Sequence, residues 1–126
     1  MPKQTVVTKA ELHAALREPQ GERDMAAILD RLPVYYERQY FYARPRRLRA
    51  DFALWRPGRP PRFRLCLVEC TGGIFSRQAH GSITGILADI GRLNAATLAS
   101  WLMLRFTPDM ISDGRAEELL ERMCKL

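Results

Sequence analysis

The stretch that decides the fold is FRLCLVEC, residues 63–70, which is followed at once by TGG, residues 71–73. Apolar residues occupy both alternating faces of this stretch, a pattern typical of a strand that is buried on both sides. One glutamate, Glu69, nevertheless stands near its end. Either the strand lies at a sheet edge and Glu69 points to water, or Glu69 lies in a cleft, where carboxylates serve binding and catalysis.

The segments on either side predict further strands and helices. Aromatic and β-branched residues predict strands in 34–45 and 47–55, and PGRPP, residues 57–61, predicts the turn that pairs the second of these with 63–70. Residues 101–106 predict a fourth strand. Helices are predicted from the capping box Thr8–Glu11 through residue 17, over 22–32 and 82–100, and from Pro108 onward.

This order, α-α-β-β-β-α-β-α, predicts one α/β domain over residues 1–126, with a four-stranded mixed sheet flanked by helices. It divides into an N-terminal helical part (1–33), a core (34–107) and a C-terminal helix (108–126). A chain of 126 residues, 47% apolar and 27% charged, fits a single globular domain.

Composition also limits the location of the protein. No apolar run approaches the roughly 20 residues of a membrane-spanning helix, and the N-terminal residues lack the apolar core of a secretory signal. The chain has three cysteines, an odd number, and their spacing does not match a zinc site. Both facts favour free, reduced thiols. We therefore expect a cytoplasmic protein with no membrane partner.

The charge is strongly basic and unevenly distributed. The net charge is +6, seventeen of the twenty basic residues are arginine, and ten arginines lie between residues 31 and 64 beside only two acids, Glu37 and Asp51. Such a basic segment favours a polyanionic partner, nucleic acid above all, although an arginine-rich solvated surface would give the same composition.

Two carboxylates are expected to meet at one end of the predicted sheet. Asp51 begins one strand and Glu69 ends the next, so an antiparallel hairpin would place them side by side. Carboxylate oxygens suit Mg²⁺ or Mn²⁺, and the bare backbone of Gly72 and Gly73 would let a phosphate approach. Ion pairs with the nearby arginines are the alternative, and the pattern alone leaves both open.

Five segments in order sharpen the choice: RADFALW, LCLVECTGG, RQAH, ADIGRLNAA and WLMLRFTPDMISDG. Together they cover roughly residues 37–114 and resemble the small phage and bacterial endonucleases of the PD-(D/E)XK superfamily, relatives of the very-short-patch-repair-like nucleases. The resemblance implies a restriction-endonuclease-like core, a bound Mg²⁺ or Mn²⁺, and hydrolysis of DNA phosphodiester bonds, with branches, junctions or mismatches among the suitable substrates.

The resemblance also implies roles for particular residues. Asp51, Glu69 and the backbone carbonyl of Cys70 would hold the metal, and Thr71, His80 and Arg92 would complete the catalytic group. Supporting residues would be Glu37, Asp89 and Asn94; candidate phosphate contacts are Arg44, Arg46, Arg47, Arg49, Gly72, Gly73 and Arg77.

Two departures from the family pattern leave the activity open. Thr71 stands where the superfamily usually has lysine and this subgroup an acid, and Arg92 replaces a helix lysine. The first hypothesis is a metal-dependent DNA endonuclease in a bacterial or phage-infected cell, for which a homodimer would suit cleavage of both strands. The second is a non-catalytic nucleic-acid-binding protein on a degenerated nuclease fold, and a third is a basic adaptor for an acidic protein.

Overall fold

The centre of the molecule is a four-stranded sheet in the order β1-β2-β3-β4. The computed structural model describes residues 8–9, 19–71 and 83–126. The strands are β1 (Tyr35–Phe41), β2 (Arg49–Trp55), β3 (Arg64–Cys70) and β4 (Met103–Phe106). The first three pair antiparallel, whereas β4 runs parallel to β3 and therefore needs a crossover connection. The predicted mixed sheet of one α/β domain is confirmed.

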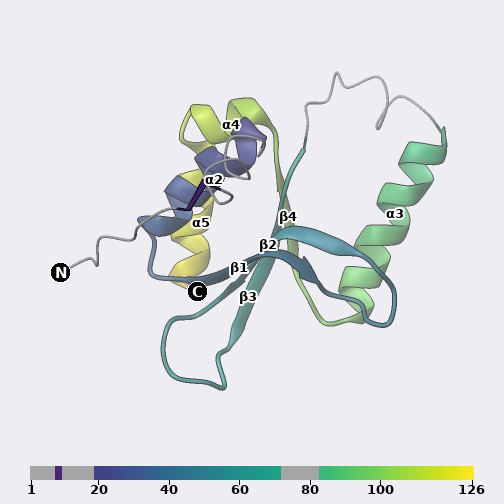
Figure 1. Cartoon of the computed structure of the whole chain (residues 1–126), viewed down its shortest axis with the longest axis horizontal. Coiled ribbons are helices and arrows are strands. Elements are labelled where there is room, and N and C mark those ends of the chain that lie inside the picture. Colours follow the sequence, from purple (N-terminus) through teal and green to yellow (C-terminus); the bar gives the residue numbers. More distant parts are fainter. Residues whose placement is uncertain (1–7, 10–18, 72–82) are drawn as a thin grey trace.

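Helices lie on both sides of this sheet. They are α2 (Gln20–Asp30), α3 (Ile83–Leu98), α4 (Pro108–Ser112) and α5 (Arg115–Cys124). Figure 1 shows α2, α4 and α5 gathered on one side, with α3, which forms part of the crossover, on the other. The helix predicted over residues 8–17 lies almost wholly outside the described residues. Within the described ranges, no helix has both the length and the apolar character needed to span a membrane.

The single helix predicted after Pro108 is in fact two helices. Thr107 caps α4 through its side chain, which accepts from the N–H of Met110, and the helix stops after five residues. Gly114 then adopts φ 91°, a left-handed conformation that cannot continue an α-helix. The chain therefore turns at Gly114, and α5 begins in a new direction.

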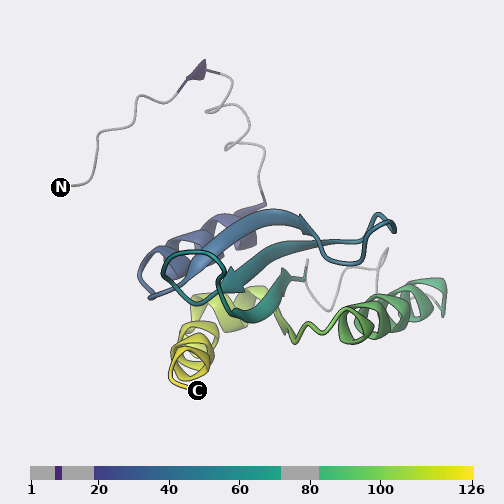
Figure 2. The same cartoon turned by 90° about the horizontal axis from the view of Figure 1, so that it is seen from below.

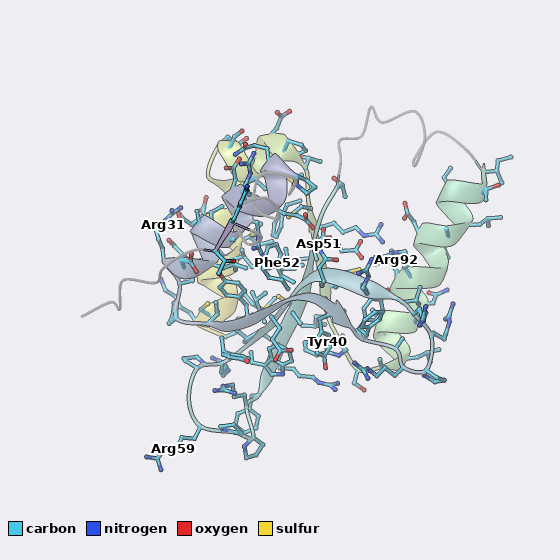
Figure 3. All side chains as sticks on the ribbon, viewed as in Figure 1. Arg31, Tyr40, Asp51, Phe52, Arg59 and Arg92 are labelled. Carbon is cyan, nitrogen blue, oxygen red and sulfur yellow. The ribbon has the colours of Figure 1, made fainter. Side chains whose placement is uncertain are left out.

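The larger core lies between the sheet and the helices α2, α4 and α5. Phe52 and Val68, on adjacent strands, are fully buried against Met25 and Leu29 of α2 and Leu120 of α5. Figure 3 shows the Phe52 side chain directed to this helical side. The helix predicted over residues 22–32 thus buries Met25 and Leu29 against the sheet.

The opposite face of the sheet is covered by α3 only in part. Ala95 and Ala96, near the C-terminal end of α3, pack with Ala53, Leu67 and Trp101 in a second cluster. The larger apolar residues that produced the helical periodicity are exposed instead: Ile83, Ile86, Leu87, Ile90 and Leu93. The helix accordingly projects from the body of the molecule (Figure 1 and Figure 2). Small residues at the contact and a projecting N-terminal part leave room for a pocket beside the sheet.

Candidate active site

The hairpin of β2 and β3 brings Asp51 and Glu69 together. The antiparallel register pairs Phe52 with Val68 and Ala53 with Leu67, and one further step places Asp51 opposite Glu69. Because side chains alternate along a strand, both carboxylates lie on the same face as Ala53 and Leu67, the face toward α3. Figure 3 shows Asp51 and Arg92 on the side of the sheet where α3 lies.

These side chains line a pocket with a volume of about 310 Å³. Its walls come from β2, β3, α3 and the neighbouring β4, so four segments that are separate in sequence contribute to it. The lining residues are Asp51, Glu69, Cys70, Thr71, Asp89, Arg92 and Arg105. Three acids and two arginines therefore face one small volume, which is unusual for a purely structural cavity.

Glu69 lies in this cleft and not in water, which answers the question raised by its place in the sequence. It is only 9% exposed. Its Oε1 accepts a hydrogen bond from Arg92 Nη2, and its Oε2 lies 3.3 Å from Arg105 Nε. The two guanidinium groups offset the cost of burying a carboxylate, which would be large without partners.

Arg92 ties α3 to the hairpin. Besides Glu69, its Nη2 donates to the carbonyl oxygen of Arg49 at 2.8 Å. Burial by itself lowers the pKa of Arg92, but the hydrogen bond and the charge of Glu69 outweigh it, so the pKa of the guanidinium is raised. Arg92 therefore stays protonated and acts in this pocket as a cation and not as a proton acceptor.

Arg105 is a member of the pocket that the sequence analysis did not identify. In the parallel pairing of β3 with β4 it is the register partner of Glu69. Its Nη1 lies 3.8 Å from Asp89 Oδ2, whereas its Nε and Nη2 are buried without a hydrogen-bond acceptor among the described residues. The only sequence signal for it was the crossover, which implies a parallel β4 but does not give its register.

Asp51 is held by the backbone of the neighbouring strand. Its Oδ2 accepts from the N–H of Cys70 at 2.8 Å, which fixes the carboxylate across the strand pair. The pKa of the Cys70 thiol is raised to about 12, first by burial and then by the charges of Asp51, Glu22 and Glu69. Glu22, a buried acid of α2 that the sequence analysis did not identify, acts on Cys70 but does not line the pocket.

Thr71 makes two hydrogen bonds to the next strand. Its N–H and its hydroxyl both donate to the carbonyl oxygen of Phe106, at 2.9 and 3.2 Å. The hydroxyl hydrogen is thereby directed to the backbone of β4. Thr71 lines the pocket, but it supplies no charge at the position where the superfamily usually has lysine.

The two carboxylates fit a magnesium ion in number and in chemistry. Mg²⁺ in proteins is commonly held by one or two carboxylates, with water and substrate phosphate as its other ligands. Within the described residues, no group of three or more His, Cys, Asp or Glu side chains could hold a metal, so the protein side would supply few ligands. Metal binding to Glu69 further requires that Arg92 and Arg105 give up their contacts with it.

A second pocket lies beside the first, in the connection between β1 and β2. Its volume is about 580 Å³, and Phe41, Pro45 and three arginines, Arg44, Arg46 and Arg47, line it. The guanidinium carbons of Arg44 and Arg49 both lie 5.7 Å from the centroid of the Phe41 ring. In the described part of the chain, none of the four guanidinium groups of Arg44, Arg46, Arg47 and Arg49 forms an ion pair.

The remaining arginines of the basic segment do not extend this cluster. Arg31 pairs with Glu117, and Arg64 donates to the carbonyl of Ala99. Arg59 lies in the connection between β2 and β3, at the opposite end of the hairpin from Asp51 (Figure 3). The ten arginines are thus spread over several surfaces, and four of them gather near the carboxylates.

Some of the predicted site residues lie elsewhere. Glu37 is an exposed residue of β1 that accepts from the Tyr35 hydroxyl at 3.1 Å, and Asn94 is an exposed residue of α3. Neither lines the carboxylate pocket. Gly72, Gly73, Arg77 and His80 lie outside the described residues.

Comparison of the chain with protein-family models, curated proteins and solved structures found no match. The functional interpretation therefore depends on the geometry of the two pockets and on the order of the sequence motifs.

Proposed function

We propose that this protein is a metal-dependent DNA endonuclease that acts in the cytoplasm. The observation that supports the proposal most directly is the joint placement of Asp51 and Glu69 in one pocket, at one end of the β2–β3 hairpin. The neighbouring arginine pocket gives the proposal a substrate class. Four guanidinium groups without acidic partners suit the phosphates of a polynucleotide.

Asp51 and Glu69 would hold Mg²⁺ or Mn²⁺, with the backbone carbonyl of Cys70 as a third ligand. Such an ion supplies Lewis-acid polarisation of the phosphate and a more acidic bound water. The hydrogen bond from the Cys70 N–H keeps Asp51 oriented before any ligand arrives, so little rearrangement of this carboxylate is needed.

The two arginines of the pocket would act on the phosphate. Arg92 and Arg105 approach Glu69 from α3 and β4. Hydrogen bonds from guanidinium groups to the non-bridging oxygens would offset the negative charge that develops at phosphorus. The two arginines would thus supply the positive charge that the motif lysine provides in the superfamily, but neither can serve as a general base.

The β1–β2 connection would hold the phosphates that flank the scissile one. Arg49 lies two residues before Asp51 on the same strand, a separation of about 6.6 Å. Tyr42 lies between the two pockets. Its hydroxyl donates to the Arg92 carbonyl at 3.4 Å. Burial raises the pKa of Tyr42, and the charges of Arg92, Glu69, Arg105 and Arg46 act on it to a smaller extent. A nucleic-acid strand could thus contact both pockets at once.

The decisive experiment is cleavage of end-labelled duplex, single-stranded and four-way-junction DNA in Mg²⁺, Mn²⁺ or EDTA. The proteins compared are the parent chain, Asp51→Asn, Glu69→Gln and the control Glu117→Gln, which removes an equally charged acid paired with Arg31 away from the pocket. We expect metal-dependent cleavage by the parent and the control, and a loss of at least about 100-fold in the two pocket variants, with DNA binding retained. Undiminished cleavage by both pocket variants would refute the site.

One observation favours a second candidate, a non-catalytic DNA-binding protein. Both oxygens of Glu69 face arginines, and the Thr71 hydroxyl is engaged by Phe106, so the pocket resembles a closed ion-pair network. The same experiment separates the candidates, because this one gives DNA binding without cleavage in every metal.

A further inference from the structure

Arg105 has hydrogen-bonding capacity that the described residues leave unused. Its Nε and Nη2 are buried, and no hydrogen-bond acceptor among those residues receives their N–H groups. The distance of 3.3 Å from Nε to Glu69 Oε2 is an ion-pair distance, but the N–H is not aimed at that oxygen. Buried donors without a hydrogen bond are unfavourable, and Arg105 has two of them inside a pocket, whereas Arg23 and Arg62 each have one in the described part of the chain. The two donors of Arg105 therefore point to an external acceptor.

A phosphate group is the acceptor that matches these donors. Its oxygens are charged, and a guanidinium group binds them through two parallel N–H bonds. Arg92 reaches the same carboxylate from the opposite wall, with one nitrogen shared between Glu69 and the Arg49 carbonyl. A phosphate entering the pocket would therefore meet two guanidinium groups that share Glu69 as a partner, while Arg92 also donates to Arg49 and Arg105 lies 3.8 Å from Asp89.

Metal binding at Glu69 opposes the present arrangement. A divalent cation beside Glu69 would stand next to two guanidinium groups, and like charges at such short range repel strongly. If a phosphate anion accepts the hydrogen bonds of Arg92 and Arg105, the glutamate oxygens become available and the anion also neutralises the added charge. Only ion pairs are exchanged in this step, and no covalent bond changes.

We propose that Arg92 and Arg105 couple nucleic-acid binding to metal binding, because a substrate phosphate displaces Glu69 from the two arginines and so frees it for the metal. This inference rests on the proposed metal-dependent function. It adds that the nucleic acid and the metal help each other to bind. Arg92 and Arg105 are then positioning residues for Glu69 in the free protein and phosphate ligands in the complex. By linkage, bound metal must raise the affinity for nucleic acid by the same factor by which nucleic acid raises the affinity for metal.

The test is a binding measurement. Mn²⁺ is titrated calorimetrically into the protein alone and into its complex with a duplex oligonucleotide that carries uncleavable phosphorothioate linkages, with the oligonucleotide titrated separately as a blank. Fluorescence anisotropy then gives the affinity for the labelled oligonucleotide with and without Mn²⁺. For the parent we expect both affinities to rise by at least about tenfold, and by equal factors.

Arg105→Gln is the informative variant, and Arg31→Gln is its control. The glutamine keeps a polar side chain but removes the cation beside Glu69, so Mn²⁺ should bind the free variant more tightly and the coupling factor should fall toward one. Arg31 pairs with Glu117 away from the pocket, so its loss removes the same charge and should leave the coupling factor unchanged. Arg92→Gln, on the partly exposed α3, is the second variant if Arg105→Gln does not fold.

The possible results are distinct. Coupling of the parent that disappears in the pocket variants but persists in Arg31→Gln supports the proposal. Mn²⁺ binding that is independent of the oligonucleotide, or coupling that the pocket variants retain, overturns the ion-pair exchange and leaves the metal site standing. Absence of Mn²⁺ binding by every protein, with or without oligonucleotide, overturns the proposed function itself.

Discussion

At the scale of single residues, the character of the site follows from the hydrogen-bond and ion-pair partners of its polar groups. Asp51 obtains a backbone N–H from Cys70, and Glu69 obtains two guanidinium groups. Thr71 obtains the Phe106 carbonyl. A backbone partner cannot leave, whereas a side-chain partner can rotate away. Asp51 is therefore the fixed element of the site, and Glu69 is the element that can change partners.

Thr71→Val tests whether the Thr71 hydroxyl has a structural or a catalytic role. Valine has the same shape and removes the hydroxyl, but the N–H of residue 71 still donates to the Phe106 carbonyl, so no buried acceptor is left unpaired. We expect a loss of about 0.5 kcal/mol in the free energy of unfolding, at the low end for a hydrogen bond, measured by urea denaturation. Cleavage should stay close to that of the parent, and a large fall in rate would instead assign Thr71 a catalytic role.

Cys66 should make the free energy of unfolding decrease at alkaline pH. Burial, with a smaller effect of Cys124, raises the pKa of its thiol from 9.0 to about 12. The folded state therefore keeps the proton above pH 9, where the unfolded chain releases it. The resulting stabilisation is complete below pH 9 and is lost as the pH rises toward 12.

The corresponding measurement is urea denaturation of the parent and of Cys66→Ala at about pH 7.5 and about pH 10. Between these conditions the parent should lose about 1.4 kcal/mol more than the variant, because the unfolded thiol is then one unit above its pKa. The cavity that alanine leaves destabilises the variant equally at both pH values, so its effect cancels when the two pH values are compared within each protein. Equal losses in both proteins would show that the thiol contributes nothing to the alkaline transition.

The same residues show how far sequence patterns reach. The meeting of Asp51 with Glu69 follows from two local facts, the alternation of side chains along a strand and a short turn between two strands. The contact of Arg105 with Glu69 depends on the register of β3 against β4, which is set by packing across a crossover of more than thirty residues. No local pattern determines that register, so Arg105 could not be identified before the fold was known.

At the scale of elements, the strands and helices were predicted correctly where a strong local sequence signal determines them. The strands β2 and β3 fall within the predicted segments, and Pro108 begins a helix as expected. The single predicted helix passed over Asp113-Gly114, a dipeptide typical of turns. In the fold, α5 turns back onto the sheet and buries Ala116 and Leu120. The exposed aliphatic side chains of α3 show the reverse case, a helical periodicity whose apolar residues do not form the contact with the sheet.

Two glycines of these elements should respond oppositely to the same substitution. Gly114 has φ 91°, which costs an L-residue about 1 kcal/mol, although an added Cβ would meet no atom within 4 Å. Gly91 lies within α3 with equally open surroundings, and alanine is favoured over glycine in a helix by about 0.5–1 kcal/mol. Gly114→Ala should therefore lower the thermal midpoint and Gly91→Ala should raise it. If Gly114→Ala were neutral, the left-handed turn between α4 and α5 would be wrong.

At the scale of the whole molecule, the arginines differ in whether an acidic side chain pairs with them. Arg44, Arg46, Arg47 and Arg49 gather at the end that carries the carboxylates. Arg115 and Arg31, in contrast, pair with acids. A net charge of +6 thus attracts a polyanion in general. The four arginines without acidic partners among the described residues concentrate this attraction at the end of the hairpin that carries the carboxylates.

The salt dependence of DNA binding should reveal which arginines touch phosphate. Each duplex phosphate contact contributes about 0.9 to the slope of log affinity against log salt concentration. The double variant Arg46→Gln/Arg47→Gln should therefore reduce the slope by about 1.8, as measured by fluorescence anisotropy of a labelled duplex over a range of salt concentrations. Arg115→Gln removes a guanidinium group that is paired with Asp113 at 2.8 Å, so it should leave the slope unchanged. If all three slopes agree, the β1–β2 connection does not contact phosphate.

Because the slope counts released counterions irrespective of cleavage, the measurement holds for a nuclease and for a non-catalytic DNA-binding protein alike. Failure to bind DNA at any salt concentration would instead favour an acidic protein as the partner of this basic surface.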